Sequence, residues 1–198
     1  MSSNPIQDFF DSLADNWPKA DESSDPRIRA LFDSLSLKEG DHVLDLACGR
    51  GVITLFLANK AKTPVLGLDL SSKMIAHARE DYEGQTEVTF RQGDFLDPSF
   101  TRKFDYIVCY NAYPHFLSPE EFNEALFRHL TDHGRFAIVH SLGREQLANH
   151  HRGCGPSLSR DLKEVASEAK AFEEDFVILQ AREGEDFYLI EGKKKPRS

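Results

Sequence analysis

Residues His42–Gly51 read HVLDLACGRG, and this stretch decides the fold of the chain. Its first half is almost continuously apolar, which is typical of a strand buried on both faces of a parallel sheet. The run ends at Gly49 and Gly51, and an apolar pattern with helical spacing follows at once from Val52. Glycine permits a sharp turn and lets a ligand approach the backbone closely. Strand, glycine turn and helix predict the first half of a nucleotide-binding βαβ unit.

Three residues near this turn bear on the ligand. A dinucleotide-binding fingerprint has a third glycine at position 54, where this chain has Thr54. Asp45 lies inside the strand, where a carboxylate would repel a pyrophosphate and would suit a cationic ligand. Asp69 follows Gly51 by 18 residues, close to the interval at which an acidic residue bonds the ribose hydroxyls. The alternative for Asp69 is an ordinary helix cap, because Ser71 opens the next helix.

The rest of the chain alternates strands with helices and ends in a hairpin. Strands are expected at 64–69, 87–93, 104–110, 135–140, 172–182 and 187–191, and helices at 6–14, 26–35, 52–60, 73–82, 118–130 and 143–151. Residues 132–134 are expected to form a turn, and Ser159 or Asp161 is expected to cap a helix that runs to about Ala171. This order predicts a single α/β domain with a Rossmann-like, seven-stranded, mainly parallel sheet and a C-terminal antiparallel hairpin.

Two motifs give the chain a family resemblance. VLDLACGRG (Val43–Gly51) followed by VLGLDLSSKMIAHARE (Val65–Glu80) resembles the first two motifs of the class I methyltransferases that depend on S-adenosylmethionine (SAM). The resemblance covers roughly 9–192. The stretches NAYPHF (111–116) and HSLGREQLANHH (140–151) are similar to a bacterial small-molecule methyltransferase branch. The resemblance implies SAM as cofactor and methyl transfer to a small-molecule acceptor.

The resemblance also assigns cofactor contacts to residues at the strand ends. They are Asp45, Ala47, Gly49, Gly51, Asp69, Leu70, Asp94, Phe95 and Asn111. Asp94 matches an acid that meets the adenine amine in such enzymes, with Phe95 against the ring, although Asp94 could instead shape a turn. Methyltransferases that act on adenine bases carry Asp/Asn-Pro-Pro-aromatic after the fourth strand. Ala112 replaces the first proline here, which puts nucleic-acid base methylation in doubt.

Three histidines are the candidates for the acceptor side. His115, His140 and His151 lie beyond strand ends or in the insert that follows, where ligands of open α/β sheets bind. Histidine can act there as a general base or bind an anionic acceptor, or it can simply bond a strand-end backbone group. Their spacing with Cys154 lacks a tight metal-ligand pattern, so no metal is predicted. We expect the three rings to converge on one cavity.

The predicted domain plan has one core with a cover. Residues 37–198 form the SAM-binding core, with an insert at about 142–158. The helices within 1–36 either cover the cofactor pocket, with Phe10 and Trp17 as contacts, or pack on the sheet edge.

Composition narrows the partners and the compartment. The 198 residues carry a net charge of −9, which disfavours nucleic acid as a partner. Three cysteines form no paired framework, and no membrane-spanning stretch or signal segment is apparent. We expect a cytoplasmic monomer or homodimer. Two alternatives to a methyltransferase stay open: a SAM-binding regulatory module without turnover, and an NAD-type oxidoreductase, which Thr54 and Asp45 disfavour.

Overall fold

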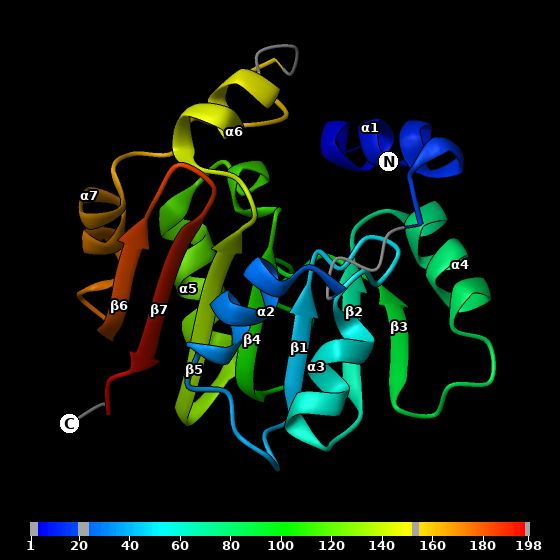
Figure 1. Ribbon diagram of the computed structural model, residues 1–198, viewed down its shortest axis with the longest axis horizontal. Helices are drawn as coiled ribbons and strands as arrows, with labels where there is room; N and C mark the ends of the chain where they lie inside the picture. Colours follow the sequence, from blue (N-terminus) through cyan, green and yellow to red (C-terminus); the bar gives the residue numbers. More distant parts are fainter. Residues whose placement is uncertain (1–3, 20–23, 152–154, 197–198) are drawn as a thin grey trace. The chain divides into compact units, whose positions relative to one another are not determined.

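The computed structural model describes residues 4–19, 24–151 and 155–196, which divide into two compact units, residues 1–100 and 101–198. The first unit contains, in order, α1 (Pro5–Leu13), η1 (Ala14–Asn16), α2 (Pro26–Asp33), β1 (Val43–Leu46), α3 (Thr54–Ala61), β2 (Val65–Asp69), α4 (Ser72–Asp81) and β3 (Val88–Gln92) (Figure 1). The second contains β4 (Phe104–Tyr110), η3 (Tyr113–His115), α5 (Pro119–His129), β5 (Leu130–His140), α6 (Arg144–His151), α7 (Val165–Ala169), η4 (Lys170–Phe172), β6 (Phe176–Glu183) and β7 (Tyr188–Lys194).

The first unit is built on three parallel strands. β2 pairs with β1 on one side and with β3 on the other, in registers that include Leu44 opposite Leu66 and Val65 opposite Val88. All four residues of β1 are buried, as the apolar run predicts. Because the strands are parallel, their carboxyl ends and the loops that follow lie at the same edge of the sheet (Figure 1). That edge carries most of the predicted cofactor contacts.

Local sequence determines where the helices begin. Ser71 caps α4, and its hydroxyl accepts a hydrogen bond from the Met74 backbone nitrogen at 3.1 Å. Ser118 caps α5 in the same way, with Pro119 at the first helical position and acidic residues in the first turn. These starts lie within two residues of those predicted.

The second unit pairs parallel and antiparallel strands. β4 and β5 are parallel, β7 is antiparallel to β5, and β6 is antiparallel to β7. Its core is aromatic: Phe136 lies 5.0 Å from Phe172 and 4.9 Å from Phe176, measured between ring centroids. Such ring pairs stabilise a core beyond the burial of their area.

The described strands form one seven-stranded sheet in the order β3-β2-β1-β4-β5-β7-β6. The predicted Rossmann-like fold with a mainly parallel sheet and a C-terminal antiparallel hairpin is therefore confirmed. No helix in residues 4–19, 24–151 or 155–196 is long and apolar enough to cross a membrane.

Three local predictions are wrong. The expected turn at 132–134 lies inside β5, where the register steps from Phe104 opposite Leu130 to Tyr106 opposite Arg135. The extra residues form an irregularity in a continuous strand.

The helix expected from Ser159 or Asp161 begins only at Val165. The preceding backbone is held by tertiary bonds instead. Arg160 donates its backbone N–H to the Pro114 carbonyl at 3.0 Å, and Lys163 donates its own to the Glu168 carboxylate at 3.1 Å. The strand expected from residue 172 accordingly starts later, at Phe176.

Candidate functional site

The turn between β1 and α3 contains three residues with left-handed backbone. Ala47, Gly49 and Gly51 have φ angles of 55°, 54° and 84°. For Ala47 this conformation costs about 1–3 kcal/mol, which the surrounding structure offsets. A Cβ on Gly49 would meet nothing within 4 Å, whereas one on Gly51 would lie 2.8 Å from the Phe90 ring. Gly49 therefore leaves the backbone open to a ligand, and Gly51 lets the turn pack closely on β3.

Asp69, at the end of β2, holds this turn through both carboxylate oxygens. Oδ2 accepts a hydrogen bond from the Gly49 backbone nitrogen, and Oδ1 accepts one from the Ser71 backbone nitrogen, both at 2.8 Å. An ionised carboxylate can accept about four such bonds, so capacity for two hydroxyl donors remains. Burial raises the pKa of Asp69 to about 6, against the lowering effect of the Ser71, Gly49 and Leu70 backbone groups, and the charge of Asp11 adds to the rise.

Asp45 supports the turn from within the sheet. The residue is 1% exposed, and its Oδ2 accepts a hydrogen bond from the Thr54 hydroxyl at 2.5 Å. Burial raises the pKa of Asp45 to about 7, the bond from Thr54 opposes this rise, and the nearby charge of Asp69 adds to it. Because Thr54 is the first residue of α3, this contact ties β1 to the helix that follows the glycine turn.

The loop after β3 carries the predicted adenine contacts. Asp94 is exposed, and its Oδ1 accepts a hydrogen bond from the Leu96 backbone nitrogen at 2.8 Å, so it does shape a turn. Phe95 is only 2% exposed and presents little surface to a ligand. Leu70 and Leu96 are partly exposed and offer more apolar surface than Phe95.

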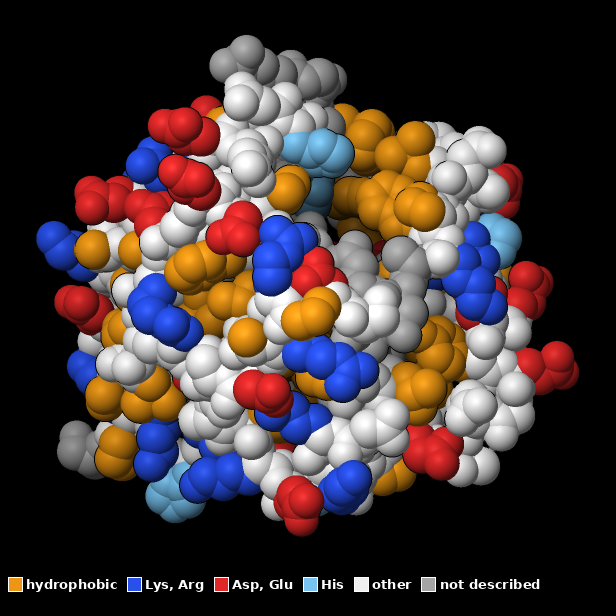
Figure 2. Space-filling view, in the orientation of Figure 1, with side chains coloured by type: hydrophobic (Ala, Val, Ile, Leu, Met, Phe, Trp, Pro, Cys, Tyr) orange, Lys and Arg blue, Asp and Glu red, His pale blue; other side chains and the backbone are white. Residues whose placement is uncertain are grey.

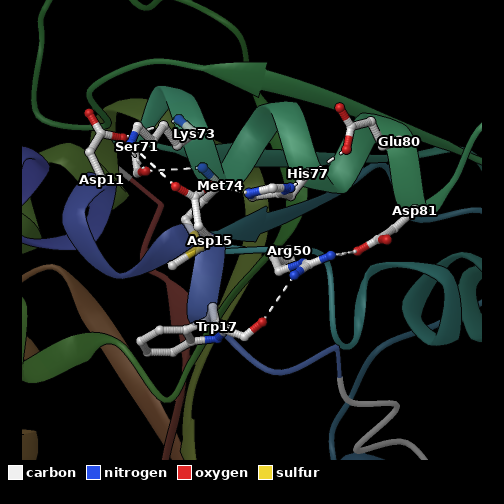
Figure 3. Close-up of polar contacts among 10 residues, drawn as sticks. All are labelled: Asp11, Asp15, Trp17, Arg50, Ser71, Lys73, Met74, His77, Glu80 and Asp81. Atoms are coloured by element: carbon white, nitrogen blue, oxygen red, sulfur yellow. Dashed lines mark hydrogen bonds and ion pairs between the residues drawn. The ribbon is translucent and has the colours of Figure 1, made fainter.

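The N-terminal segment is attached to α4 by carboxylates. Asp11 accepts hydrogen bonds from the Ser71 hydroxyl at 2.5 Å and from the Lys73 backbone nitrogen at 3.1 Å (Figure 3). Asp15 lies 3.0 Å from His77 Nε2 and 3.6 Å from Lys73 Nζ. The positive end of the α4 dipole favours a carboxylate at its first turn. Asp11 therefore joins the N-terminal helix to the loop that Asp69 organises.

Arg50, between the two glycines of the turn, makes a second attachment. Its Nη1 donates to the Trp17 carbonyl at 3.0 Å, while its Nε and Nη2 lie 3.0 and 2.9 Å from Asp81 Oδ2 (Figure 3). The Arg50 and Asp81 side chains are 15% and 11% exposed, so solvent screens this pair less than a surface pair. The glycine turn and the N-terminal segment are thus bonded directly.

The opposite side of α1 is apolar. None of the residues Pro5–Leu13 is fully buried, and Phe10 packs edge to face on Trp17 with ring centroids 6.0 Å apart. Hydrophobic side chains gather at the surface over α1 in Figure 2. The helix is therefore held by its polar side and presents its apolar side.

In the second unit, Asn111 directly follows β4 and has a φ angle of 52°. Its side-chain nitrogen donates to the Ser141 hydroxyl, and its Oδ1 accepts from the Ser141 backbone nitrogen, both at 2.9 Å. The predicted cofactor contact Asn111 therefore also bridges the ends of β4 and β5.

His115 ends the short helix η3 and is partly exposed. Its Nδ1 lies 2.7 Å from the Leu158 carbonyl oxygen. A carbonyl can only accept, so Nδ1 carries the proton, and in the neutral ring the lone pair is on Nε2. Burial lowers the pKa of His115; the bond to Leu158 opposes this, and the charge of His150 adds to the lowering.

The other two predicted histidines lie in different surroundings. His140, the last residue of β5, is fully buried, with its ring 6.2 Å from that of Tyr188. His151 ends α6, and its side chain lies outside the described residues, as does Cys154. Among the residues that the structure describes, no three His, Cys, Asp or Glu side chains gather as metal ligands would.

Sequence interpretation missed several residues that organise this region. Thr54 was considered only because it replaces the third glycine of a dinucleotide fingerprint, although its hydroxyl bonds Asp45. Asp11 and Asp15 are four residues apart, the spacing of side chains on one helix face. Arg50 is a charged residue inside the glycine turn. Both features indicate side chains that bond another part of the chain. No local signal marks Leu158, because its backbone carbonyl makes the contact.

The chemistry of the first unit fits a nucleoside with a cationic group better than a dinucleotide. Asp69 retains accepting capacity for a diol, the Gly49 backbone is open, and Leu70 offers an apolar surface. The two acidic groups Asp45 and Asp69 lie close enough to raise the pKa of Asp45, and a pyrophosphate beside them would be repelled.

Comparison with known proteins gives a consistent result. Residues 43–134 match a family model described as a methyltransferase domain. The demethylmenaquinone methyltransferase of Lactobacillus johnsonii is 29% identical over 117 residues, which are 56% of this chain and 48% of that protein. The chain thus spans about half the length of this curated relative.

Solved structures share the fold. A chain from the complex of the Haloferax volcanii Trm112 methyltransferase activator with a methyltransferase is 20% identical, with a TM-score of 0.75 over 98% of this chain and 99% of that one. A SAM-dependent methyltransferase from Aquifex aeolicus is 18% identical, with a TM-score of 0.69 over 93% and 98%. The strand order, the glycine turn and the matched domain agree: residues 43–134 form a methyltransferase domain, and the chain has the fold of SAM-dependent methyltransferases.

Proposed function

We propose that this protein transfers a methyl group from SAM to a small-molecule acceptor. The observation that carries the proposal is the position of Asp69, which holds the open Gly49 turn and keeps capacity for two more hydrogen bonds. When bound, SAM supplies a methyl group already activated by its sulfonium. The protein's own residues then bind, orient and exclude water.

The binding roles follow from the contacts of the first unit. Asp69 accepts the ribose hydroxyls, Gly49 gives access to the backbone, and Leu70 and Leu96 contact the adenine face. Asp94 keeps an exposed carboxylate for the adenine amine. The remaining predicted contacts act mainly through structure: Asp45, Ala47 and Gly51 shape the turn, Phe95 supports the loop from beneath, and Asn111 holds the end of β4.

We assign the N-terminal helix as the cover of the cofactor. Asp11 bonds Ser71, whose backbone nitrogen bonds Asp69, and Arg50 joins the glycine turn to Trp17. Both attachments end on residues that organise the proposed ribose site. We therefore expect the N-terminal helix to become more ordered when the ribose site is occupied.

His115 is our candidate for a general base. A base is required only when the acceptor loses a proton, as an alcohol or phenol does. The depressed pKa of His115 leaves the ring neutral at pH 7, and its lone pair is on Nε2. His140, buried against Tyr188, is assigned to the wall of the acceptor site, and His151 remains a second candidate on α6.

The first experiment addresses the cofactor. Calorimetry with SAM and with NAD should give a micromolar-range affinity for SAM and none for NAD. Binding of NAD in place of SAM would overturn the assignment. Turnover to S-adenosylhomocysteine with a panel of phenols, quinols, amines and thiols then separates an enzyme from a regulatory module. The panel includes a demethylmenaquinone analogue because of the relative's name.

The second experiment addresses the base. With a phenolic acceptor, His115→Ala should lower kcat about 10²–10⁴-fold and leave SAM affinity nearly unchanged. His133→Ala, an exposed histidine in the β5 irregularity, is the matched control. Equal rates for the two variants would remove His115 from the mechanism.

The remaining assignments concern setting and partners. Cys48 and Cys109 are buried free thiols, which supports a reducing, cytoplasmic setting. The net charge of −9 supports a small acceptor over nucleic acid. The likeness to a chain solved with an activator protein adds a protein partner to the proposed monomer or homodimer. Light scattering of the purified protein measures which form it adopts.

A further inference from the structure

Arg160 makes several contacts with the η3 turn, which carries His115. The backbone nitrogen of Arg160 donates to the Pro114 carbonyl at 3.0 Å, and its Nε donates to the Phe116 carbonyl at 3.1 Å. Its guanidinium carbon lies 4.6 Å from the centroid of the Tyr113 ring. Arg160 therefore contacts the residue before His115, the residue after it, and the residue that begins η3.

The same segment also contacts His115 itself. Two residues before Arg160, the carbonyl of Leu158 accepts the hydrogen bond from His115 Nδ1 at 2.7 Å. Ser159 between them is 8% exposed. Leu158 and Arg160 thus both bond a turn that precedes them by more than 40 positions in the chain. Residues 160–164, where a helix was expected, are not helical, and the contacts with the η3 turn come from the start of this stretch and from Leu158 before it.

Arg160 is held in turn by a buried carboxylate. Glu168 on α7 is 2% exposed, and its Oε1 accepts from Arg160 Nη2 at 2.7 Å and from the Tyr113 hydroxyl at 2.9 Å. Its Oε2 accepts from the Lys163 backbone nitrogen at 3.1 Å. A buried ion pair with both oxygens bonded keeps a fixed geometry, because breaking it leaves a buried charge uncompensated.

We propose that Arg160, anchored by Glu168, is a positioning residue that holds His115 in the tautomer with its proton on Nδ1, which is the form that the proposed base role requires. This inference deepens the proposed function and rests on it for the role of His115. Arg160 holds both partners of the Nδ1 bond, since it bonds the η3 turn and lies two residues after Leu158, whose carbonyl accepts the bond. Fixing the bond fixes the ring nitrogen that carries the lone pair.

The burial of Tyr113 is consistent with this arrangement. Tyr113 is fully buried, and burial raises the pKa of its hydroxyl well above the usual range, with the charge of Arg160 opposing the rise and that of Glu168 adding to it. The hydroxyl therefore stays protonated and donates to Glu168. The charged and titratable groups around the η3 turn are His150 from α6, Arg160 from the loop before α7, and Glu168 from α7.

Nitrogen-15 NMR of histidine-labelled protein tests the inference without any acceptor. In the wild type, His115 should show one neutral tautomer, with the proton on Nδ1, and a midpoint below that of an exposed histidine. Arg160→Met should produce a mixture of tautomers and move the midpoint toward the exposed value. Arg160→Lys keeps the positive charge and the backbone bond to Pro114. It loses the planar guanidinium that stacks on Tyr113 and its several N–H donors, so the tautomer ratio and midpoint should lie between those of the wild type and Arg160→Met.

Arg102→Met is the matched control, because Arg102 is exposed and stacks on the Phe104 ring at 5.4 Å within the same unit. It should leave the His115 signals unchanged. With a phenolic acceptor, Arg160→Lys should lower kcat about tenfold with little change in KM and shift the pH profile with the NMR midpoint.

The outcomes separate this inference from the proposed function. A folded Arg160→Lys or Arg160→Met protein with an unchanged His115 tautomer and midpoint would overturn the positioning role. If Arg160→Met does not fold, Arg160→Lys and Tyr113→Phe supply the same readout. A changed tautomer together with a wild-type rate for His115→Ala would support the positioning role and refute the base. Loss of both responses would refute both.

Discussion

Thr54 donates its hydroxyl proton to the Asp45 carboxylate across 2.5 Å, at the junction of β1 and α3. A glycine at position 54, as in a dinucleotide-binding fingerprint, would leave this carboxylate buried without that donor. The acid inside the strand and the threonine after the turn therefore form one unit. Burial, which the bond from Thr54 offsets only in part, raises the pKa of Asp45 and makes it a pH-dependent element of the fold.

Asp45→Asn should flatten the pH dependence of stability. The folded-state pKa of Asp45, about 7, lies above its ordinary value of 3.8. Between these values the folded protein holds the proton and the unfolded chain does not, so stability falls as the pH rises toward 7. The neutral amide avoids this loss and should raise the free energy of unfolding at pH 8 by on the order of 1–4 kcal/mol. Urea unfolding at pH 5 and pH 8 measures it.

The control for that series is Asp97→Asn, since Asp97 lies in an exposed turn. Parallel pH curves for the wild type and Asp45→Asn would show that the buried carboxylate titrates normally.

Asp69→Ala should weaken SAM binding at least tenfold. The substitution removes the acceptor for the ribose hydroxyls and releases the Gly49 backbone nitrogen, and hydrogen bonds to a charged group are worth about 1.5–3 kcal/mol each. Wild-type affinity should also fall below about pH 6, where Asp69 becomes protonated. Calorimetry at pH 5 and pH 8 checks both effects. Unchanged affinity for Asp69→Ala would remove the ribose assignment.

Gly51→Ala should destabilise the protein more than Gly40→Ala. Both glycines have left-handed backbone, with φ angles of 84° and 90°, so the conformational cost of about 1–2 kcal/mol is shared. Only at Gly51 would the new methyl group meet a ring, that of Phe90 at 2.8 Å, which should add about 1–3 kcal/mol. Denaturant unfolding of the two variants gives the difference. Equal losses of unfolding free energy in the two variants would mean that the Phe90 ring on β3 moves aside at no cost.

Arg50→Met should loosen the N-terminal segment without unfolding the sheet. It removes the bond to the Trp17 carbonyl and the pair with Asp81, interactions worth about 1.5–3 kcal/mol when partly shielded. Limited proteolysis within residues 4–19 should accelerate about tenfold, and SAM should dissociate faster. Arg27→Met, which breaks an exposed pair with Asp25, is the control. Equal cleavage of the two variants would show that Arg50 does not retain the segment.

Much of the fold could be predicted because its signals are local. The strand at 104–110 and the helix that starts at Ser118-Pro119 depend on an apolar run and on a cap, and the structure has both. The hairpin follows from two apolar runs around an acidic, glycine-containing turn. Hydrophobic periodicity and helix caps depend only on residues that are close in sequence, so helices and strands of this kind can be predicted from it.

The rest could not be predicted because it depends on contacts between distant residues. Serine is a common helix cap, yet no helix begins at Ser159, and the backbone N–H of the next residue bonds the Pro114 carbonyl instead. The spacing from Gly51 predicts Asp69 as a candidate contact, whereas its bond to the Gly49 backbone is apparent only in the folded chain. The tautomer of His115 depends on a carbonyl 43 residues away, and a backbone carbonyl leaves no trace in the sequence.

The irregular pairing of β5 has an evolutionary consequence. The methyltransferase domain match ends at residue 134, inside the stretch where β5 steps out of register with β4. A strand that already accommodates extra residues can absorb an insertion or deletion without moving the pairing on either side. Related chains should therefore differ in length at residues 131–134 more often than in the paired stretches on either side.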